Sequence, residues 1–226
     1  MEFDSFVLAA ATADLGDEPA AREHADAVEF RMDLATDPLA ALDDYDGELP
    51  LLVTNRDAAE GGDADAPERE RLAVLETASA HDAVGAIDVE LSSLRESAGE
   101  ALAATARDRG VHVVASVHDF EATPAESRLV DLLAAAAESG DVGKVAVTAH
   151  DRSDALAVLS ATHTATARGD RVATMAMGEA GRHTRAVAPL YGSTIGYAPV
   201  DPAEATAPGQ YDLATLATLV ERLGGR

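Results

Sequence analysis

The sequence predicts a single (β/α)8 barrel, and three observations support this fold class. Short apolar or alternating segments recur eight times along the 226 residues, and an alanine-rich segment with helical periodicity follows each of them. No change of composition marks a second domain, and the length suits one catalytic barrel spanning residues 1–226. An open doubly wound sheet is disfavoured, because no G-x-G-x-x-G turn follows the first predicted strand.

The predicted strands and helices alternate along the whole chain. We expect strands at residues 5–11, 27–33, 50–55, 84–91, 111–117, 142–148, 171–176 and 191–196. We expect helices at residues 18–25, 37–44, 67–80, 93–108, 124–138, 152–168, 180–187 and 211–223. Strands that alternate with helices pair in parallel, and the helices then cover the faces of the sheet.

Local signals mark several of the expected helix ends. Thr123 and Pro124 predict a helix N-terminus, with the threonine as N-cap and the proline at the first helical position. Gly110, Gly140 and Gly169 stand where three of the predicted helices should end, because glycine readily adopts the backbone conformation that terminates a helix.

Apolar and polar residues alternate within the central strands, so each of these strands has two distinct faces. Helices cover the outside of a parallel barrel, so the apolar face should meet the helices and the polar face should point inward. Charged groups inside a barrel are costly unless they pair or surround a ligand. We therefore interpret the inward set as a site near the carboxyl ends of the strands: Glu29, Arg31, Asp33, Asp88, Glu90, Ser116, His118, Lys144 and Thr148.

Composition excludes several classes of partner. A formal net charge of −24 argues against nucleic acid and anionic membranes. The apolar fraction of 47% argues against disorder, so the acidity indicates a surface adapted to concentrated salt and a halophilic source. The chain has no cysteine, which excludes disulfides and thiolate metal sites. No basic leader or long apolar run is present, so we expect a cytoplasmic protein.

Lysine occurs only once in the chain, at Lys144, although Lys and Arg together number 17. An amine can form an imine with a carbonyl, whereas a guanidinium cannot. Lys144 lies on the predicted inward face, with the small Ala146 above it and with Arg31 and Arg56 expected nearby. His118 should lie on the neighbouring strand, where a neutral imidazole can exchange protons near pH 7.

Seven motifs carry this candidate site in order along the chain. They are EFRMD (29–33), TNRDAAEGG (54–62), DVE (88–90), SVHDF (116–120) with the following Thr-Pro, the strand of Lys144, MGEAGRHTR (177–185) and TAPGQ (206–210). With these motifs, from about residue 5 to the C-terminus, the chain resembles type I 3-dehydroquinate dehydratase, the Schiff-base enzyme of the shikimate pathway. The resemblance implies a (β/α)8 barrel that converts 3-dehydroquinate into 3-dehydroshikimate without cofactor or metal ion, commonly as a homodimer.

The resemblance also implies a role for each matching residue. Lys144 matches the imine-forming lysine, His118 the general acid/base, and Glu60 the acidic residue near that histidine. Three further sets match groups that bind substrate. Glu29, Arg31 and Arg56 match those around the hydroxyls, and Arg185 and Gln210 match those at the carboxylate. Met177 matches a hydrophobic wall, and Thr206 lies beside Gln210. Two departures keep a hydroxyl where serine is usual, at Thr184 and Thr206, and Tyr191 falls where the family usually has phenylalanine.

Other interpretations stay open at this point. Asp88 and Glu90 suit an internal ion-pair network as well as they suit catalysis, and Glu90 is a candidate for orienting His118. The acidic loop at residues 57–67 suits a solvated flap. The chain could be another Schiff-base lyase or aldolase, or a binding barrel without catalysis. A metal-dependent hydrolase using Asp88, Glu90, His118 and Asp119 is weaker, because no H-x-H or H-E-x-x-H spacing occurs.

Overall fold

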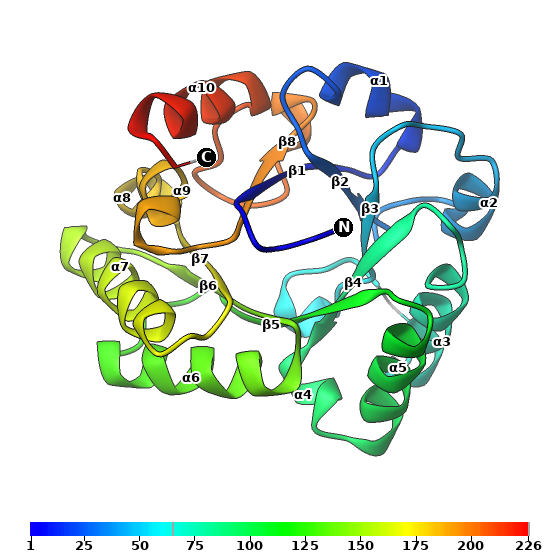
Figure 1. The fold of residues 1–226 in the computed structure, drawn as a ribbon, viewed down its shortest axis with the longest axis horizontal. Helices are drawn as coiled ribbons and strands as arrows, with labels where there is room; N and C mark the ends of the chain where they lie inside the picture. The colour runs from blue at the N-terminus through cyan, green and yellow to red at the C-terminus, as the bar shows by residue number, and fades with distance from the viewer. Residues whose placement is uncertain (65, 226) are drawn as a thin grey trace.

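Eight parallel strands wrap around a central axis in the structure, a computed structural model that describes residues 1–64 and 66–225 (Figure 1). Neighbouring strands pair in the order β7-β6-β5-β4-β3-β2-β1-β8, which confirms the predicted (β/α)8 barrel. Asp65, within the predicted flap at 57–67, and Arg226 lie outside the described residues. The strands are β1 (Val7–Thr12), β2 (Ala27–Arg31), β3 (Leu51–Thr54), β4 (Val84–Glu90), β5 (His112–Asp119), β6 (Val142–Thr148), β7 (Val172–Met177) and β8 (Ile195–Pro199).

The barrel closes least completely between β7 and β8. An isolated bridge between Val172 and Ser193 joins β7 to the segment before β8, and Thr194 N donates to Val172 O at 2.8 Å. The sequence predicts this last strand too early, at 191–196. It begins later because the 3-10 helix η3 (Ala188–Tyr191) and Gly192, with a φ of 99°, occupy the start of that range.

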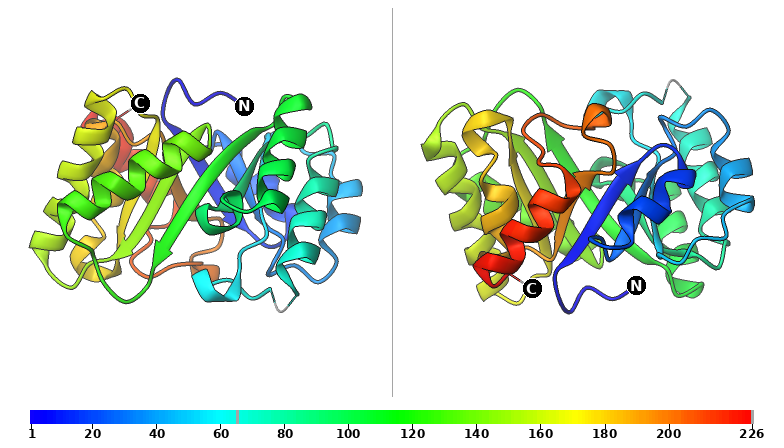
Figure 2. Two further views of the ribbon diagram at one scale, coloured as in Figure 1. Left: turned by 90° about the horizontal axis from the view of Figure 1, so that it is seen from below. Right: turned by 90° about the horizontal axis from the view of Figure 1, so that it is seen from above.

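Helices surround the strands on the outside of the barrel (Figure 2). Those that follow β3 to β6 include the longest, and α10 closes the chain. The α-helices are α1 (Glu18–Ala21), α2 (Pro38–Asp43), α3 (Glu68–Ala78), α4 (Leu91–Leu94), α5 (Ser97–Asp108), α6 (Glu126–Ser139), α7 (Arg152–Ala167), α8 (Gly178–Gly181), α9 (Thr184–Val187) and α10 (Leu213–Leu223). The remaining 3-10 helices are η1 (Leu15–Asp17), η2 (Ala58–Glu60) and η4 (Pro202–Glu204).

Three predicted helices differ from the observed ones. The helix expected at 18–25 ends at Ala21, and the one expected at 180–187 is divided into α8 and α9. The helix expected at 93–108 is divided into α4 and α5, which meet at a close contact. A Cβ added to Gly99 would lie 2.0 Å from Ser93 O, so α5 packs on the end of α4 and cannot continue it.

The predicted N-cap at Thr123 is wrong. Helix α6 begins at Glu126, with Ala125 as its N-cap residue and no side-chain cap. Thr123 Oγ1 instead donates to Thr148 O at 2.8 Å, which ties the segment after β5 to the end of β6. The glycines at 110, 140 and 169 do follow the ends of α5, α6 and α7, as predicted.

The central strands β2, β4, β5 and β6 have an apolar outer face and a mixed inner face, as the alternation predicts. Val28, Phe30 and Ile87 are fully buried in a core shared with residues of α3 and α5. Apolar inner residues, among them Val7 and Val114 near the amino ends of their strands, form a second cluster with Phe3, which precedes β1. The inward polar residues lie above that cluster, toward the carboxyl ends of the strands.

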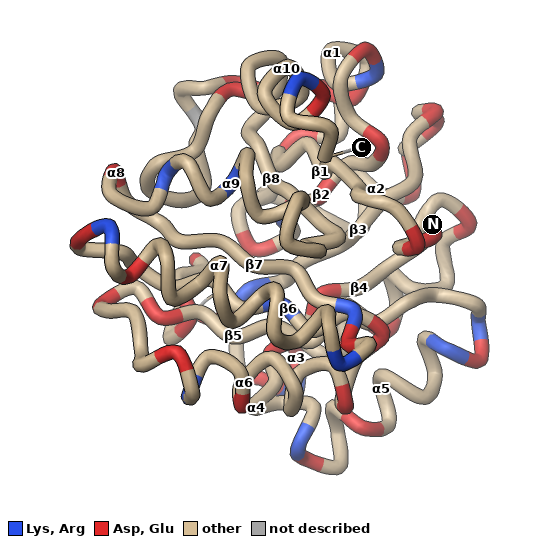
Figure 3. The backbone as a smooth tube through the Cα atoms, turned by 60° about the vertical axis from the view of Figure 1, so that its left-hand side comes forward, with Lys and Arg blue, Asp and Glu red and all other residues tan. Residues whose placement is uncertain are grey.

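Outside the barrel, acidic residues predominate over basic ones (Figure 3), unlike in the interior, where acidic and basic side chains pair. Figure 3 shows acidic residues spread over the outer helices and loops, with the fewer basic residues among them. Over residues 1–64 and 66–225, no helix has the length and apolar composition that a membrane span requires.

Candidate active site

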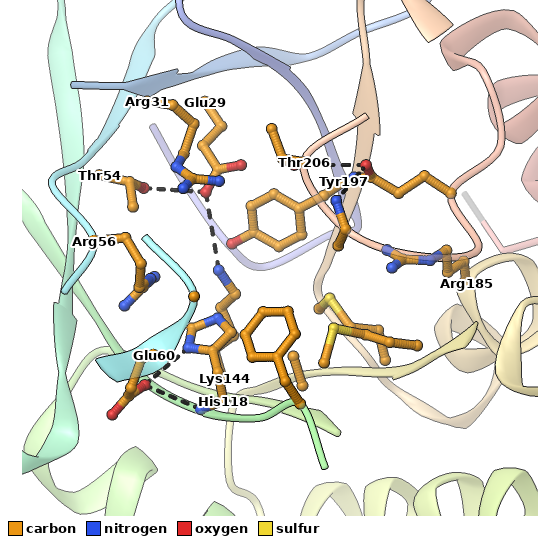
Figure 4. A pocket seen from close by; sticks show the side chains of 17 residues that line it. Glu29, Arg31, Thr54, Arg56, Glu60, His118, Lys144, Arg185, Tyr197 and Thr206 are labelled. Carbon is orange, nitrogen blue, oxygen red and sulfur yellow. Dashed lines mark hydrogen bonds and ion pairs between the residues drawn. The ribbon is translucent and has the colours of Figure 1, made fainter. Parts of the chain in front are cut away.

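A pocket opens at the carboxyl ends of the strands and encloses about 470 Å³, including space open to solvent (Figure 4). It brings together every catalytic and substrate-binding residue that the sequence predicts. The lining residues are Glu29, Arg31, Thr54, Arg56, Glu60, Gly61, His118, Phe120, Lys144, Ala146, Met175, Met177, Arg185, Tyr197, Thr206, Ala207 and Gln210.

Lys144 projects from β6 into the base of this pocket and is only 4% exposed. Its Nζ lies 2.9 Å from Asp88 Oδ2 and 3.9 Å from Glu29 Oε1. The ring of Tyr197 covers the amine at 4.3 Å from Nζ to the ring centroid. Arg31 and Arg56 line the same pocket, as expected, but the groups nearest the amine are carboxylates and an aromatic face.

These four side chains come from alternate strands, namely β2, β4, β6 and β8. In a (β/α)8 barrel, inward side chains from alternate strands occupy one layer of the interior, normally filled by branched apolar residues. Here the layer consists of Glu29, Asp88, Lys144 and Tyr197, and all three partners contact the amine. The layer therefore replaces core packing with an enclosed amine beside two carboxylates.

His118 lies at the end of β5 and contacts Glu60 from the 3-10 helix η2. Glu60 Oε2 is 2.9 Å from His118 Nδ1 and also accepts from the His118 backbone N at 3.0 Å. With Glu60 ionised, Nδ1 carries the proton that it donates, which leaves Nε2 as a proton acceptor. The register places His118 opposite Ala146, one inward position above Lys144.

Burial shifts the proton affinity of both members of this pair. Burial, together with the positive charges of Arg56 and Lys144, lowers the pKa of His118 well below its usual value, so the imidazole is neutral at pH 7. Burial also raises the pKa of Glu60 to about 7, against the opposing effect of Arg56. A neutral base beside a carboxyl group that titrates near neutrality suits proton transfer in both directions.

Arg56 is held by the carboxylates of β4. Its Nη2 lies 2.7 Å from Asp88 Oδ1, and its Nη1 lies 2.9 Å from Glu90 Oε1 and 2.7 Å from Ser116 Oγ. Burial alone would raise the pKa of Asp88, but Arg56 and Lys144 outweigh burial and lower it, so Asp88 is ionised.

Glu90 does not contact His118, so it does not orient the imidazole directly. Its oxygens accept from Arg56, from the backbone N of Asp57 at 3.0 Å and from Arg71 at 3.3 Å. Arg71 also donates to Asn55 O at 2.7 Å. Glu90 and Arg71 therefore hold the segment after β3.

The residues expected around the substrate hydroxyls are anchored by short contacts. Thr54 Oγ1 donates to Glu29 Oε1 at 3.0 Å. Arg31 binds both oxygens of Asp33, at 2.9 and 2.6 Å, so its guanidinium is fixed at the pocket wall.

Arg185 lies on the opposite side of the pocket from Arg56 (Figure 4), and Gln210 also lines the pocket. Arg185, on α9, is almost fully buried and forms no ion pair within residues 1–64 and 66–225. It donates to Pro208 O at 3.3 Å, its Nε has no partner among the described residues, and burial lowers its pKa to about 10. A buried guanidinium without a counter-ion suits binding of an anionic ligand group.

The loop after β8 is tied to this arginine. Gln210 Oε1 accepts from Ala207 N at 3.1 Å and from Thr206 Oγ1 at 3.5 Å. The turn passes so close to β7 that a Cβ on Gly209 would lie 2.5 Å from Gly178 O. Glycine at 209, with a φ of 77°, therefore lets the loop bring Gln210 to the pocket.

Among the tyrosines, sequence reasoning gives no role to Tyr197 and associates Tyr191 with the site instead. Tyr191 lies on η3, is 39% exposed and packs edge-on against His163, so it is not in the pocket. The pocket tyrosine is Tyr197 on β8. Placing the strand at 191–196 hides it, whereas alternation from Ile195 would have shown that Tyr197 faces inward. Other lining residues that the sequence analysis does not single out are Thr54, Phe120, Met175 and Ala207.

The ligand set of the alternative metal hydrolase is occupied by other contacts. Asp88 and Glu90 bind Arg56, and Asp119 Oδ1 accepts from the backbone N of Glu121 and Ala122. No group of three or more His, Asp or Glu suited to a metal ion occurs within residues 1–64 and 66–225. This donor set does not fit a metal centre, because its oxygens already bind cations or backbone amides.

Comparisons with known proteins identify the family. Residues 8–225 match the family model of type I 3-dehydroquinase. The chain is 61% identical over 227 residues to a 3-dehydroquinate dehydratase of Haloarcula marismortui, covering 99% of this chain and 98% of that protein. It is 56% identical over 227 residues to the enzyme of that name from Halobacterium salinarum, covering 99% and 100%. The crystal structure of 3-dehydroquinate dehydratase from Geobacillus kaustophilus has a TM-score of 0.85 and 27% identity, covering 98% and 92%. The chain therefore belongs to the type I 3-dehydroquinase family.

Proposed function

We propose that this enzyme dehydrates 3-dehydroquinate to 3-dehydroshikimate through an imine on Lys144. The observation that carries the proposal is the enclosed amine of the chain's single lysine, which contacts two carboxylates and lies one inward position below the His118 imidazole. Family membership, established over residues 8–225, supplies the substrate and the reaction class.

Imine formation is the first step. The Lys144 ammonium gives up one proton to a base in the pocket, and the resulting amine attacks the C3 carbonyl. The same proton returns to the carbinolamine hydroxyl, which leaves as water to give an iminium ion. The iminium carries the same charge as the ammonium that it replaces. Asp88 and Glu29, at 2.9 and 3.9 Å from Nζ, therefore stabilise the cation before and after the substrate binds.

Proton transfer by His118 is the second step. Nε2 removes a proton from C2, the electron pair moves into the iminium, and an enamine forms. The protonated imidazole then donates that proton to the C1 hydroxyl, which leaves as water while the conjugated imine forms. Hydrolysis of this imine releases product and restores Lys144. Glu60 keeps the imidazole in the required tautomer through the 2.9 Å contact with Nδ1.

The remaining pocket residues hold the substrate. Arg185 has no protein counter-ion among the described residues, so a substrate carboxylate is its natural partner, with Gln210 beside it. Polar groups at the opposite wall bind the ring hydroxyls. Met177 packs against the ring, and Thr206 borders the pocket near Gln210. The hydroxyl-binding groups are Glu29, Arg31 and Arg56.

Borohydride trapping tests this proposal. Reduction in the presence of 3-dehydroquinate should inactivate the enzyme and add one substrate-derived mass to the peptide that contains Lys144. Without borohydride, the absorbance of a conjugated enone should rise, and a chelator should leave the rate unchanged. A label on a different peptide contradicts the role of Lys144. Trapping of other carbonyl compounds, but never of 3-dehydroquinate, would favour a different Schiff-base lyase or aldolase.

We further propose that residues 1–226 act as one catalytic domain in the cytoplasm of a halophile, as a homodimer. A charge of −24 and curated haloarchaeal relatives support the halophilic assignment. Melting temperatures that stay equal in dilute and multimolar KCl would contradict it. Light scattering of the purified protein would distinguish a dimer from a monomer.

A further inference from the structure

Tyr197 presents a hydroxyl group that none of the described residues satisfies. Its side chain lines the pocket from β8, and its hydroxyl is buried without a hydrogen-bond partner among residues 1–64 and 66–225. A buried hydroxyl without a partner destabilises the folded state, so its presence needs an explanation. A ligand that supplies the missing partner is the explanation that the position of this hydroxyl favours.

Tyr45, which is half-buried, satisfies its hydroxyl within the protein. Tyr45 OH donates to Leu49 O at 2.7 Å, far from the pocket that holds Lys144. Tyr45 thus shows how this chain satisfies a structural tyrosine, and it provides a matched reference for Tyr197.

The position of Tyr197 relative to Lys144 indicates which ligand atoms it meets. Its ring centroid is 4.3 Å from Nζ, in the same layer as Asp88 and Glu29. Substrate atoms bonded to this nitrogen must therefore lie next to the tyrosine. Burial, followed by the negative charges of Glu29 and Asp88, raises the pKa of Tyr197 well above 10, so the hydroxyl keeps its proton and can donate it in a hydrogen bond.

We propose that the Tyr197 hydroxyl donates a hydrogen bond to the substrate oxygen on C4, the ring carbon next to the imine carbon, and so helps to determine specificity. The inference rests on the proposed function, because it requires substrate bonded to Lys144. A buried donor that only the correct substrate satisfies discriminates strongly against analogues that lack the acceptor. Tyr197 would then select for an oxygen at this position.

The variant Tyr197→Phe tests the inference, with Tyr45→Phe as its control. Tyr197→Phe should lower kcat/KM for 3-dehydroquinate by about tenfold, the usual cost of one neutral hydrogen bond to substrate. Its melting temperature should equal or exceed that of the parent enzyme, because an unsatisfied hydroxyl has been removed. Tyr45→Phe should show the reverse pattern, with unchanged kinetics and a lower melting temperature.

A substrate analogue separates hydrogen bonding from a general disturbance of the pocket. With 4-deoxy-3-dehydroquinate, Tyr197→Phe and the parent enzyme should have the same kcat/KM, because the acceptor is missing in both cases. The inference is overturned if Tyr197→Phe stays within twofold of the parent on 3-dehydroquinate, or if it loses the same factor with the analogue. Absence of borohydride trapping at Lys144 in the parent enzyme would instead overturn the proposed function, and this inference with it.

Discussion

The two sides of the pocket differ in how far the protein satisfies their polar groups. On the side formed by β2 to β6, Arg56 contacts two carboxylates and a hydroxyl, and Lys144 contacts two carboxylates. On the side formed by β8, α9 and the loop after β8, Arg185 has no ion pair and Tyr197 has no hydrogen-bond partner within residues 1–64 and 66–225. We call these the paired side and the unpaired side.

This difference separates two tasks within one cavity. Contacts on the paired side hold Arg56 and Lys144 in place, because a change in one of them leaves another buried charge unbalanced. Groups on the unpaired side lower the stability of the free enzyme, and under the proposed function they gain partners from the bound substrate. Removing a charged partner on the paired side should therefore lower mainly the free energy of unfolding. Removing a group on the unpaired side should lower mainly kcat/KM.

The largest effect should come from Lys144→Arg on the paired side. Arginine keeps the positive charge beside Asp88, so the ion pair survives, but a guanidinium cannot form the imine. Turnover of 3-dehydroquinate should fall by at least roughly 10⁴-fold, as expected when a covalent nucleophile is lost. The measurement is enone absorbance in concentrated KCl, with circular dichroism to verify the fold. Residual activity above a tenth of the parent rate would contradict imine chemistry at this position.

Arg185→Met should give the next largest effect, on the unpaired side. It removes the proposed partner of the substrate carboxylate while keeping most of the side-chain volume. We expect kcat/KM to fall by about 10²- to 10³-fold, mainly through KM, which is typical of the loss of a buried charged hydrogen bond. Urea denaturation should show an unchanged or slightly higher free energy of unfolding, because the buried cation has no ion-pair partner among the described residues.

Arg71→Met is the same substitution on the paired side, and it should lower stability more than it lowers kcat/KM. Arg71 is fully buried and contacts Glu90, Asp57 and Asn55. Its loss should lower the free energy of unfolding by about 3 kcal/mol, the usual cost of breaking a buried ion pair. KM should change less than in Arg185→Met, because Arg71 does not line the pocket. Equal stability losses in the two variants would remove the distinction between the sides.

The sequence predicts the barrel and the contents of the pocket well, for a physical reason. Alternation within parallel strands determines which side chains point inward, so the inward positions of Glu29, His118 and Lys144 are predicted without knowledge of contacts. The N-terminus of α6 and the start of β8 are less predictable. Thr123 donates to Thr148 at the end of β6 instead of capping α6, and the turn at Gly192 makes β8 begin later than predicted. At these two places the surrounding structure overrides the local sequence signals.

Pairing inside the pocket could not be predicted from the sequence. Lys144 lies opposite Ser116 on the adjacent strand, yet its amine bonds to Asp88 from the strand beyond it. Such contacts depend on strand tilt and stagger, which place side chains from alternate strands in one layer. The same cause hides the contact between Tyr197 and Lys144.

The smallest predicted effect concerns Glu60, which contacts the paired side only through His118. Since the pKa of Glu60 is raised to about 7, its carboxylate is ionised above that pH and protonated below it. Only the ionised form leaves His118 Nε2 free to accept a proton, so kcat/KM should rise with pH through about 7 and then level. The apparent pKa belongs to the coupled pair, not to one residue.

Glu60→Gln should move this acidic limb to lower pH, because only His118, whose pKa is lowered, then titrates. The amide oxygen can still accept from Nδ1, so we expect a loss of only about tenfold at alkaline pH. The profile should be recorded from about pH 5 to about pH 9 in constant KCl. His118→Ala is the control, since it should lose most activity at every pH and, without the imidazole, should no longer show this limb. An acidic limb that stays in place in Glu60→Gln would assign the titration to a different group and leave Glu60 with a purely positional role.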